Sequence, residues 1–387
     1  DITARICGIC PVAYQMSSCH ALEKALGLFD RIDAPIQSMR DLLYCGEWIE
    51  SHVLHMFMLH LPDFLGYESA LSMTEDHGDV VRSALSVKAA GNGLIEAIGG
   101  RSVHPVGACV GGFYKTLSKQ QVEELLGRLR PALETMCGLT VQLAETVEFP
   151  RLERDYECMA LQQAGTYAMN RGHIVTDRGL SVEPEEFLDV VEEKQVPHSN
   201  AFHAVIKGRG GYLVGPVARV NLNHAFLHPR ALELLPKVTE KAGRPLPWRD
   251  NHLSLMARAL EVVHALARAI DILEAHDPKD PVRVAAEPKA GTGAHATEAP
   301  RGLLWHQYSL DGRGAVTDAR IIPPTSQNQW TIEQDLRLAA EAAMELDDQQ
   351  ATLECERVIR NYDPCISCSV HFLRFSRSWD NSGGKTA

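Results

Sequence analysis

The chain has 387 residues, of which 45% are hydrophobic, so it is long and apolar enough to bury a large core. Its 38 basic and 50 acidic residues give a formal net charge of −12, which argues against a general nucleic-acid or anionic-membrane surface, since both need basic patches. No apolar run approaches the ~20 residues that span a membrane and no signal segment opens the chain, so we predict a cytoplasmic protein. Because the chain opens at Asp1 and runs at once into a cysteine motif, we also expect that a natural N-terminal segment is missing.

Hydrophobic residues at three- and four-residue steps predict five long helices, which we expect to form a central bundle. The first helix should end at Pro62, because proline interrupts a helix. The five helices are predicted at residues 36–61, 80–98, 120–147, 253–275 and 332–360.

The segments between the helices differ from them in amino-acid composition. Residues 167–196, 208–220 and 303–322 contain β-branched and aromatic side chains around glycine-rich turns, which predicts small sheets. Residues 278–300 are rich in Ala, Gly, Pro and Thr and predict an irregular loop. The predicted fold class is therefore mainly α, of the α+β type, with a central bundle of long helices and small peripheral sheets or hairpins in one large unit, 1–387.

Two CxxC pairs lie at opposite ends of the chain, Cys7 with Cys10 and Cys365 with Cys368. Four soft thiolates select zinc, an iron–sulfur cluster, or a nickel or iron centre. A structural zinc site usually closes over roughly 15–20 residues between its pairs, whereas most of this chain separates the two pairs, so an active centre is favoured over a zinc staple. A disulfide in either pair is a further alternative, disfavoured in a reducing cytosol.

The residues around both pairs resemble the first and last signatures of nickel-iron hydrogenase large subunits. These signatures read Arg5-Ile6-Cys7-Gly8-Ile9-Cys10-Pro11 and Asp363-Pro364-Cys365-Ile366-Ser367-Cys368-Ser369-Val370-His371. In that family one cysteine of each pair binds nickel terminally, the other bridges nickel to iron, and the iron carries carbon monoxide and cyanide. The resemblance implies that Cys7 and Cys365 are terminal ligands and that Cys10 and Cys368 are bridging ligands.

Three inner segments are similar to further motifs of the same family. The segment around Arg301, residues 298–302, resembles the motif whose arginine projects over the open face of the metal pair. Pro324 and Thr325 resemble a step that donates hydrogen bonds to a cyanide, and residues 99–105 resemble an inner Gly-Gly-x-x-x-His-Pro segment. By this resemblance Arg301 would orient a base or bind diatomic ligands through its planar fork of donors. The Cys365 thiolate would accept a proton.

The end of the chain resembles that of an unprocessed precursor. His371 is similar to the family's C-terminal histidine, which helps to hold a magnesium ion, and the backbone carbonyl near Ile321 would be a second magnesium contact. Residues 372–387 would be an extension that a maturation endopeptidase removes after nickel insertion, with a harmless variable tail as the alternative. The family's proton-relay glutamate and acidic magnesium ligand would lie before Asp1.

Tyr14 stands where many family members have a histidine, and with the following residues to Ser18 it is most similar to cytosolic, NAD(P)-coupled or sulfhydrogenase-type enzymes. The resemblance thus implies reversible oxidation of H₂ to protons and electrons. Because the chain has no other iron–sulfur motif and no dinucleotide-binding turn, it would need an iron–sulfur small subunit and flavin- or NAD(P)-binding diaphorase-type subunits. A zinc-stapled structural subunit and a regulatory hydrogen sensor are the alternatives.

Several other residues have simpler interpretations. His104 could be a satisfied histidine at a turn or could act behind the metal centre. His52, His55 and His60 are expected to be core or rim residues and not ligands. The remaining six cysteines are expected to be buried as small hydrophobic residues. They are Cys19, Cys45, Cys109, Cys137, Cys158 and Cys355.

Overall fold

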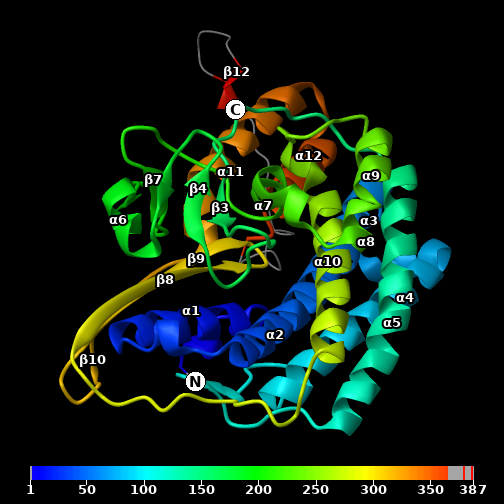
Figure 1. Cartoon of the computed structure of the whole chain (residues 1–387). Helices are drawn as coiled ribbons and strands as arrows, with labels where there is room; N and C mark the ends of the chain where they lie inside the picture. Colours follow the sequence, from blue (N-terminus) through cyan, green and yellow to red (C-terminus); the bar gives the residue numbers. More distant parts are fainter. Residues whose placement is uncertain (1, 365–377, 380–384, 387) are drawn as a thin grey trace.

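The computed structural model describes residues 2–364, 378–379 and 385–386 (Figure 1). Its centre is a bundle of four long helices, as the periodicity predicted. They are α2 (Ala34–Val53), α4 (Ala70–Gly99), α5 (Lys119–Thr146) and α10 (Ser254–Glu274). Helix α10 contacts both α2 and α5 and is buried on nearly every side, so it is the core of the bundle. Within the described residues, no helix is long and apolar enough to cross a lipid bilayer.

A three-stranded antiparallel sheet lies against α1 (Pro11–Ala25) and carries the hairpin of the site. Its order is β10 (Val316–Ile322), β9 (Gly302–Leu310), β8 (Gly291–Ala299), and the β8–β9 hairpin turns at residues 300–301. In Figure 1 this sheet extends along α1 to the side opposite α4 and α5. The sheet confirms the prediction for 303–322.

The prediction of an irregular loop at 278–300 is wrong in its second half, which is strand β8. Two of its first three residues are Gly291 and Gly293, because the strand lies very close to α1. A Cβ atom on Gly291 or Gly293 would collide with the backbone of Ala25 or Ala21. The residue types in β8 are therefore set by its close contact with α1 and not by the usual preferences of β-strands.

The first predicted helix does not stop at Pro62. Helix α2 continues through the π-helical turn η3 (Leu54–His60) into α3 (Leu61–Leu65), where Pro62 occupies the first turn and needs no N–H partner. The chain leaves the helix at Gly66, whose φ of 77° suits glycine. The helix predicted at 332–360 is also wrong as one element, because α11 (Pro324–Ala342) and α12 (Asp348–Asn361) are separated by a short break.

The sheet predicted at 208–220 is wrong, because that stretch holds helix α7 (Pro216–Asn223), and the strand lies earlier, at β7 (His203–Ile206). Strand β7 pairs with β6 (Val191–Lys194), and β3 (Met159–Gln162), β4 (His173–Thr176) and β5 (Ser181–Val182) form a second small sheet, so the prediction at 167–196 is confirmed. The short elements that remain are η1 (Thr3–Arg5), η2 (Phe29–Arg31), β1 (Ala108–Cys109), β2 (Gly112–Phe113), η4 (Pro184–Glu186), α6 (Phe187–Val190), η5 (His224–Phe226), α8 (Pro229–Leu232), α9 (Leu235–Lys241), η6 (Asn251–Leu253), η7 (Ala343–Glu345), β11 (Ser378–Trp379) and β12 (Lys385–Thr386).

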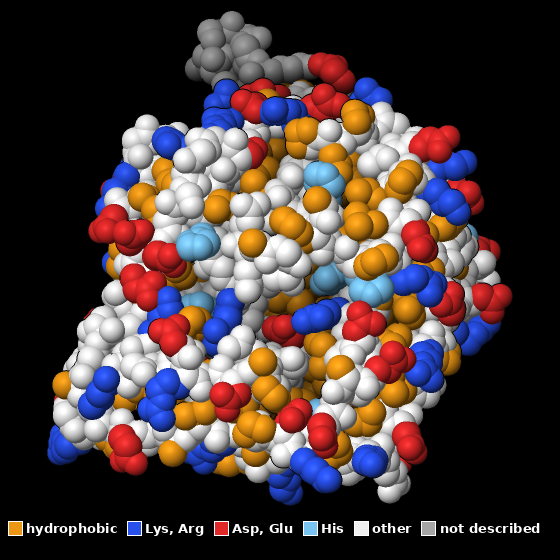
Figure 2. All heavy atoms as spheres, viewed as in Figure 1, with side chains coloured by type: hydrophobic (Ala, Val, Ile, Leu, Met, Phe, Trp, Pro, Cys, Tyr) orange, Lys and Arg blue, Asp and Glu red, His pale blue; other side chains and the backbone are white. Residues whose placement is uncertain are grey.

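The described part of the chain is mainly helical with small antiparallel sheets, which confirms the predicted fold class. Acidic and basic side chains are interspersed over the face shown in Figure 2.

Candidate metal centre

A cavity of about 560 Å³ lies where four distant parts of the chain meet. Its walls come from the segment after η1, the tip of the β8–β9 hairpin, the junction of β10 with α11, and the loop between β6 and β7. Among its lining residues are Cys7, Tyr14, Phe202, Arg301, Ile321 and Thr325. Four of the predicted site residues and Tyr14 are therefore brought together around one space.

The first cysteine pair is folded into one tight turn. The backbone N–H of Cys10 donates a hydrogen bond to Cys7 Sγ over 3.3 Å, and Cys10 is the residue directly before helix α1. The start of that helix is fixed from outside, because Glu47 of α2 accepts hydrogen bonds from the amides of Val12 at 2.6 Å and Ala13 at 3.0 Å. Cys7 is half-buried and lines the cavity, whereas Cys10 is buried behind it.

Arg301 links the first cysteine pair to the segment that leads to the second. Its Nη1 lies 3.6 Å from Cys10 Sγ, as a hydrogen-bond donor. Its Nε donates to the carbonyl oxygen of Asp363 at 2.5 Å and its Nη2 to Asp363 Oδ1 at 3.1 Å. Both Arg301 and Asp363 are buried, so these contacts are well shielded from water. Asp363 stands two residues before Cys365, and the sequence analysis gave it no role.

Burial and hydrogen bonding favour the protonated form of the Cys10 thiol when no metal is bound. The hydrogen bond with Cys7 and the burial of the side chain raise the pKa of Cys10 well above its ordinary value, although the positive charge of Arg301 acts in the opposite direction. Burial likewise raises the pKa of Glu47 well above its ordinary value. Binding of a metal to these sulfurs must therefore release protons.

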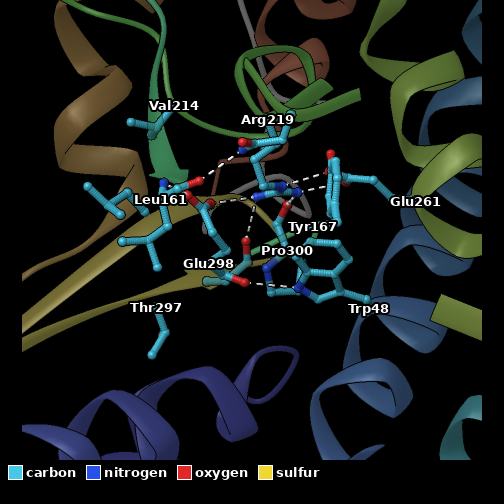
Figure 3. A network of polar contacts seen from close by, with 12 residues as sticks. Trp48, Leu161, Tyr167, Val214, Arg219, Glu261, Thr297, Glu298 and Pro300 are labelled. Carbon is cyan, nitrogen blue, oxygen red and sulfur yellow. Dashed lines mark hydrogen bonds and ion pairs between the residues drawn. The ribbon is translucent and has the colours of Figure 1, made fainter. Parts of the chain in front are cut away.

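A buried ionic network fixes the hairpin that carries Arg301 (Figure 3). Arg219 of α7 donates to the carbonyl oxygens of Ala299 at 2.9 Å and Pro300 at 3.0 Å, next to the turn. The same guanidinium contacts Glu298 Oε2 at 3.1 Å and forms a bidentate pair with Glu261 of α10 at 2.6 and 2.7 Å. These residues are all fully buried. Arg219 therefore holds the hairpin tip against the helical bundle, at the point where Arg301 projects.

Further contacts complete this network. Trp48 of α2 donates from Nε1 to the carbonyl oxygen of Glu298 at 2.9 Å, and Tyr167 donates from its hydroxyl to Glu261 Oε1 at 2.7 Å (Figure 3). His52 lies 2.9 Å from Glu261 Oε2. The sequence analysis missed the network because its members are far apart in the chain and belong to no local motif.

The other predicted site residues fall into two groups. Ile321 at the end of β10 and Thr325 in the first turn of α11 line the cavity, while Pro324 is buried beside it. The residues Cys365, Cys368 and His371 lie outside the described residues. The convergence of all four cysteines therefore stays a prediction. The continuous described segment reaches Pro364, and Asp363 within it is hydrogen-bonded to Arg301.

The predicted core position of three histidines is confirmed, and His104 lies at a turn. His52, His55 and His60 are buried in the core, and His55 Nε2 lies 2.8 Å from the carbonyl oxygen of Arg360. His104 sits in a turn with φ 51°, and its Nδ1 lies 2.7 Å from the carbonyl oxygen of Ala4, so it ties that turn to the segment before Cys7.

The six other cysteines divide by burial. Those that are buried, as expected, are Cys19, Cys45, Cys158 and Cys355. Cys109 and Cys137 are half-buried, which corrects the expectation of full burial for these two.

Comparisons with known proteins show the family of the chain. A family model described as nickel-dependent hydrogenase matches residues 1–93 and 211–371. The chain is 35% identical over 377 residues to the α subunit of sulfhydrogenase 1 of Pyrococcus furiosus, covering 96% of this chain and 86% of that protein. It is 26% identical over 418 residues to the β subunit of an NAD-reducing hydrogenase of Cupriavidus necator, covering 95% of this chain and 83% of that protein.

Solved structures give the same architecture. The structure of an NAD⁺-reducing NiFe-hydrogenase in the H₂-reduced state matches with a TM-score of 0.84 at 23% identity, covering 95% of this chain and 87% of that chain. The Ni-Fe-Se hydrogenase of Desulfovibrio vulgaris Hildenborough in its reduced state matches with a TM-score of 0.71 at 20% identity, covering 95% and 88%. At these identities the likeness concerns the fold.

Proposed function

This chain belongs to the nickel-dependent hydrogenase family as a large, catalytic subunit, and on that premise we propose that Cys7, Cys10, Cys365 and Cys368 hold its nickel–iron centre at the cavity described above. The observation that carries the proposal is the position of Arg301, between Cys10 and the residue two places before Cys365. Soft sulfur donors suit nickel and iron, and Cys7 of the described pair already lines the cavity.

When bound, the metal pair would supply Lewis-acid positions that polarise H₂, with carbon monoxide and cyanide as further iron ligands. The protein's own residues would orient the reacting groups, stabilise charge and accept the proton. The rigid, permanently charged fork of Arg301 lies at the cavity wall, where it would orient the reacting groups and stabilise negative charge. The thiolate of Cys365 would accept a proton. Pro324 and Thr325 open α11 beside the cavity, so the positive end of that helix and the Thr325 hydroxyl would favour a bound cyanide.

Two further features of the centre are proposals from the resemblance. A magnesium ion would be held by His371 and the backbone carbonyl of Ile321, whose side chain lines the cavity. A maturation endopeptidase would remove residues 372–387 after nickel insertion. The match to the family model ends at residue 371, which supports this boundary.

We propose that an iron–sulfur small subunit docks beside Cys7 and carries electrons away. Large exposed apolar side chains gather at this place, and the contact between His104 and Ala4 brings their two segments together. They are Ile2, Ile6, Val103 and Val106. The similarity to sulfhydrogenase and NAD-reducing hydrogenase subunits supports a cytoplasmic complex that passes electrons onward to NAD(P) through flavin-binding diaphorase-type subunits.

Metal analysis combined with infrared spectroscopy tests the centre. The purified complex should contain stoichiometric nickel and show stretching bands of metal-bound carbon monoxide and cyanide. Cys7→Ser should abolish nickel retention, whereas Cys109→Ser, a control on a half-buried cysteine away from the pair, should keep it. Stoichiometric zinc without nickel would show that the proposal is wrong and would restore the zinc-stapled alternative. Nickel retained in Cys7→Ser would show that Cys7 is not a required ligand and would overturn the proposed set of four cysteines.

A further inference from the structure

A second group of metal-binding side chains lies near the rim of the cavity and takes no part in the proposed centre. His198 and His203 belong to the loop between β6 and β7 and to the start of β7, and Glu333 belongs to α11. The three potential ligand atoms lie within 4.8 Å of one another. His203 Nε2 is 2.8 Å from Glu333 Oε1, and His198 Nε2 is 2.9 Å from the same oxygen.

The hydrogen bonds of His203 leave an electrostatic mismatch that a cation would resolve. Its Nδ1 lies 3.2 Å from the carbonyl oxygen of Ala201, and since a carbonyl can only accept, Nδ1 must carry a proton. In a neutral imidazole the Nε2 lone pair then points at the carboxylate of Glu333. The ring of His203 is fully buried, so water reaches this contact only from the side of the Glu333 carboxylate, which is 34% exposed. Either a second proton or a metal ion must lie between the two acceptors.

We propose that His198, His203 and Glu333 bind a divalent cation of the zinc class. Two imidazoles and one carboxylate form a ligand set that zinc uses when it keeps a fourth position open, and the ring nitrogen of His203 opposite the metal would be fixed by a backbone carbonyl. Ligands of a tetrahedral zinc ion stand roughly 3.3 Å apart, so the observed separations need to open only slightly. His198 is exposed, and this side would give the ion access from solvent.

The ion would stiffen one wall of the cavity. Ala201 and Phe202 lie between the two histidines in sequence and line the cavity, and Ser326 Oγ already donates to the carbonyl oxygen of Phe202 at 2.9 Å. A cation shared by this loop and Glu333 would tie the loop more firmly to α11. The site is thus distinct from the cysteines but mechanically connected to the space that they face.

Cobalt titration of the matured, nickel-containing complex tests the site, because the cysteine centre is then already filled. After surface metals are removed with a chelator, Co²⁺ should bind stoichiometrically and give visible absorption of a tetrahedral ion without sulfur charge-transfer bands. His198→Ala and Glu333→Gln should each weaken binding by more than about tenfold, since they remove direct ligands. His173→Ala is the matched control, because His173 is also exposed and lies 3.0 Å from one carboxylate, that of Glu183.

A second measurement tests whether the cation rigidifies the loop between β6 and β7. Hydrogen exchange of the peptide that covers residues 196–203 should slow when Zn²⁺ is added to the wild type and to His173→Ala, and should not change in His198→Ala. The proposal is wrong if cobalt does not bind stoichiometrically, or if His198→Ala binds it as tightly as His173→Ala does. In either case the cluster is an imidazolium–carboxylate contact only. Nickel content and hydrogenase activity are read separately, so this outcome leaves the proposed catalytic centre untouched.

Discussion

Arg301 contacts both sides of the proposed centre with a single guanidinium. The contact with Cys10 reaches the first cysteine pair, and the two contacts with Asp363 reach the segment before the second. A lysine has one point charge and cannot reproduce this planar fork. Arg301 should therefore be needed for the chemistry at the proposed centre.

Arg301→Lys should lower hydrogenase activity on the order of 100-fold, because an aligned charge at the reacting centre is lost. Nickel content should stay near that of the wild type, since the sulfur ligands are unchanged. Arg337→Lys, at an exposed residue of α11 paired with Glu341, is the control and should retain activity. Full activity in Arg301→Lys, measured with H₂ and an artificial electron acceptor, would refute the role of the guanidinium.

His264 makes a second residue-scale prediction, which concerns acid stability. Burial lowers the pKa of the His264 imidazole to about 3, and its Nδ1 accepts the backbone N–H of His228 at 2.9 Å. The unfolded histidine has a pKa near 6.5, so below that value the unfolded chain binds the extra proton. The neutral His264 imidazole therefore stabilises the folded protein fully above pH 6.5, and this contribution to the free energy of unfolding is lost as the pH falls toward 3.

In His264→Gln the free energy of unfolding should change less with pH, by up to about 1.4 kcal/mol per pH unit. The amide oxygen of the glutamine accepts the hydrogen bond from the His228 backbone but does not titrate. Urea unfolding of both proteins at about pH 7 and about pH 5 measures the difference. His173→Gln, at an exposed site, is the control and should keep the wild-type dependence. An unchanged pH dependence in His264→Gln would mean that this imidazole is not held neutral.

At the scale of elements, α2 and α4 cross closely at two glycines. A Cβ atom on Gly91 of α4 would lie 2.9 Å from the backbone nitrogen of Glu50 and from the carbonyl oxygen of Gly46, both on α2. Backbone atoms cannot move aside as a flexible side chain can. The glycines therefore set the distance between the two helices, and α2 in turn carries Glu47 and Trp48 to the centre.

Gly91→Ala should lower the free energy of unfolding by about 1–3 kcal/mol, because the added methyl group forces the helices apart. Gly127→Ala is the matched control on the exposed face of α5, where a Cβ would meet nothing within 4 Å. That change should stabilise the protein by about 0.5–1 kcal/mol, since alanine favours the helix. Equal unfolding midpoints for the two variants would contradict the close crossing.

The sequence correctly predicted the elements whose spacing of hydrophobic residues matches the face that they bury in the fold. Helices α5 and α10 show helical periodicity, and both were predicted to within one residue of their ends. Strand β8 was missed because the contact with α1 selects glycine and alanine, which have low strand propensity. The break between α11 and α12 contains neither glycine nor proline, and it was therefore missed. The signal that could have marked it is Asp347, whose side chain caps α12 by accepting the backbone N–H of Gln350.

The same distinction applies to the site. Cys7, Arg301 and Thr325 belong to short motifs, and the structure places all three around one cavity. Asp363 could have been found, since it stands in the second cysteine motif and is the nearest acidic group to it. Arg219 could not, because its role depends on the fold bringing α7, α10 and the hairpin together.

At the scale of the whole molecule, the exposed apolar surface beside Cys7 predicts how the enzyme assembles. Val103→Asp places a charge on this surface at a residue that is 51% exposed, so the fold should tolerate it while the iron–sulfur partner is lost. Leu71→Asp is the control, since Leu71 is exposed at the opposite end of α4. Size-exclusion chromatography of the co-expressed subunits measures the complex. Co-elution of Val103→Asp with the small subunit would place the interface elsewhere.

The contact between Arg301 and Asp363 also bears on the order in which a ribosome makes the site. Asp363 is synthesised 62 residues after Arg301, and nearly the whole chain must emerge before the second cysteine pair exists. The early turn at Cys7, the bundle and the hairpin held by Arg219 can stand ready as a receptor for that late segment. A chain that terminates before Cys365 would contain Cys7 and Cys10 but would lack the two later cysteines that are proposed as metal ligands.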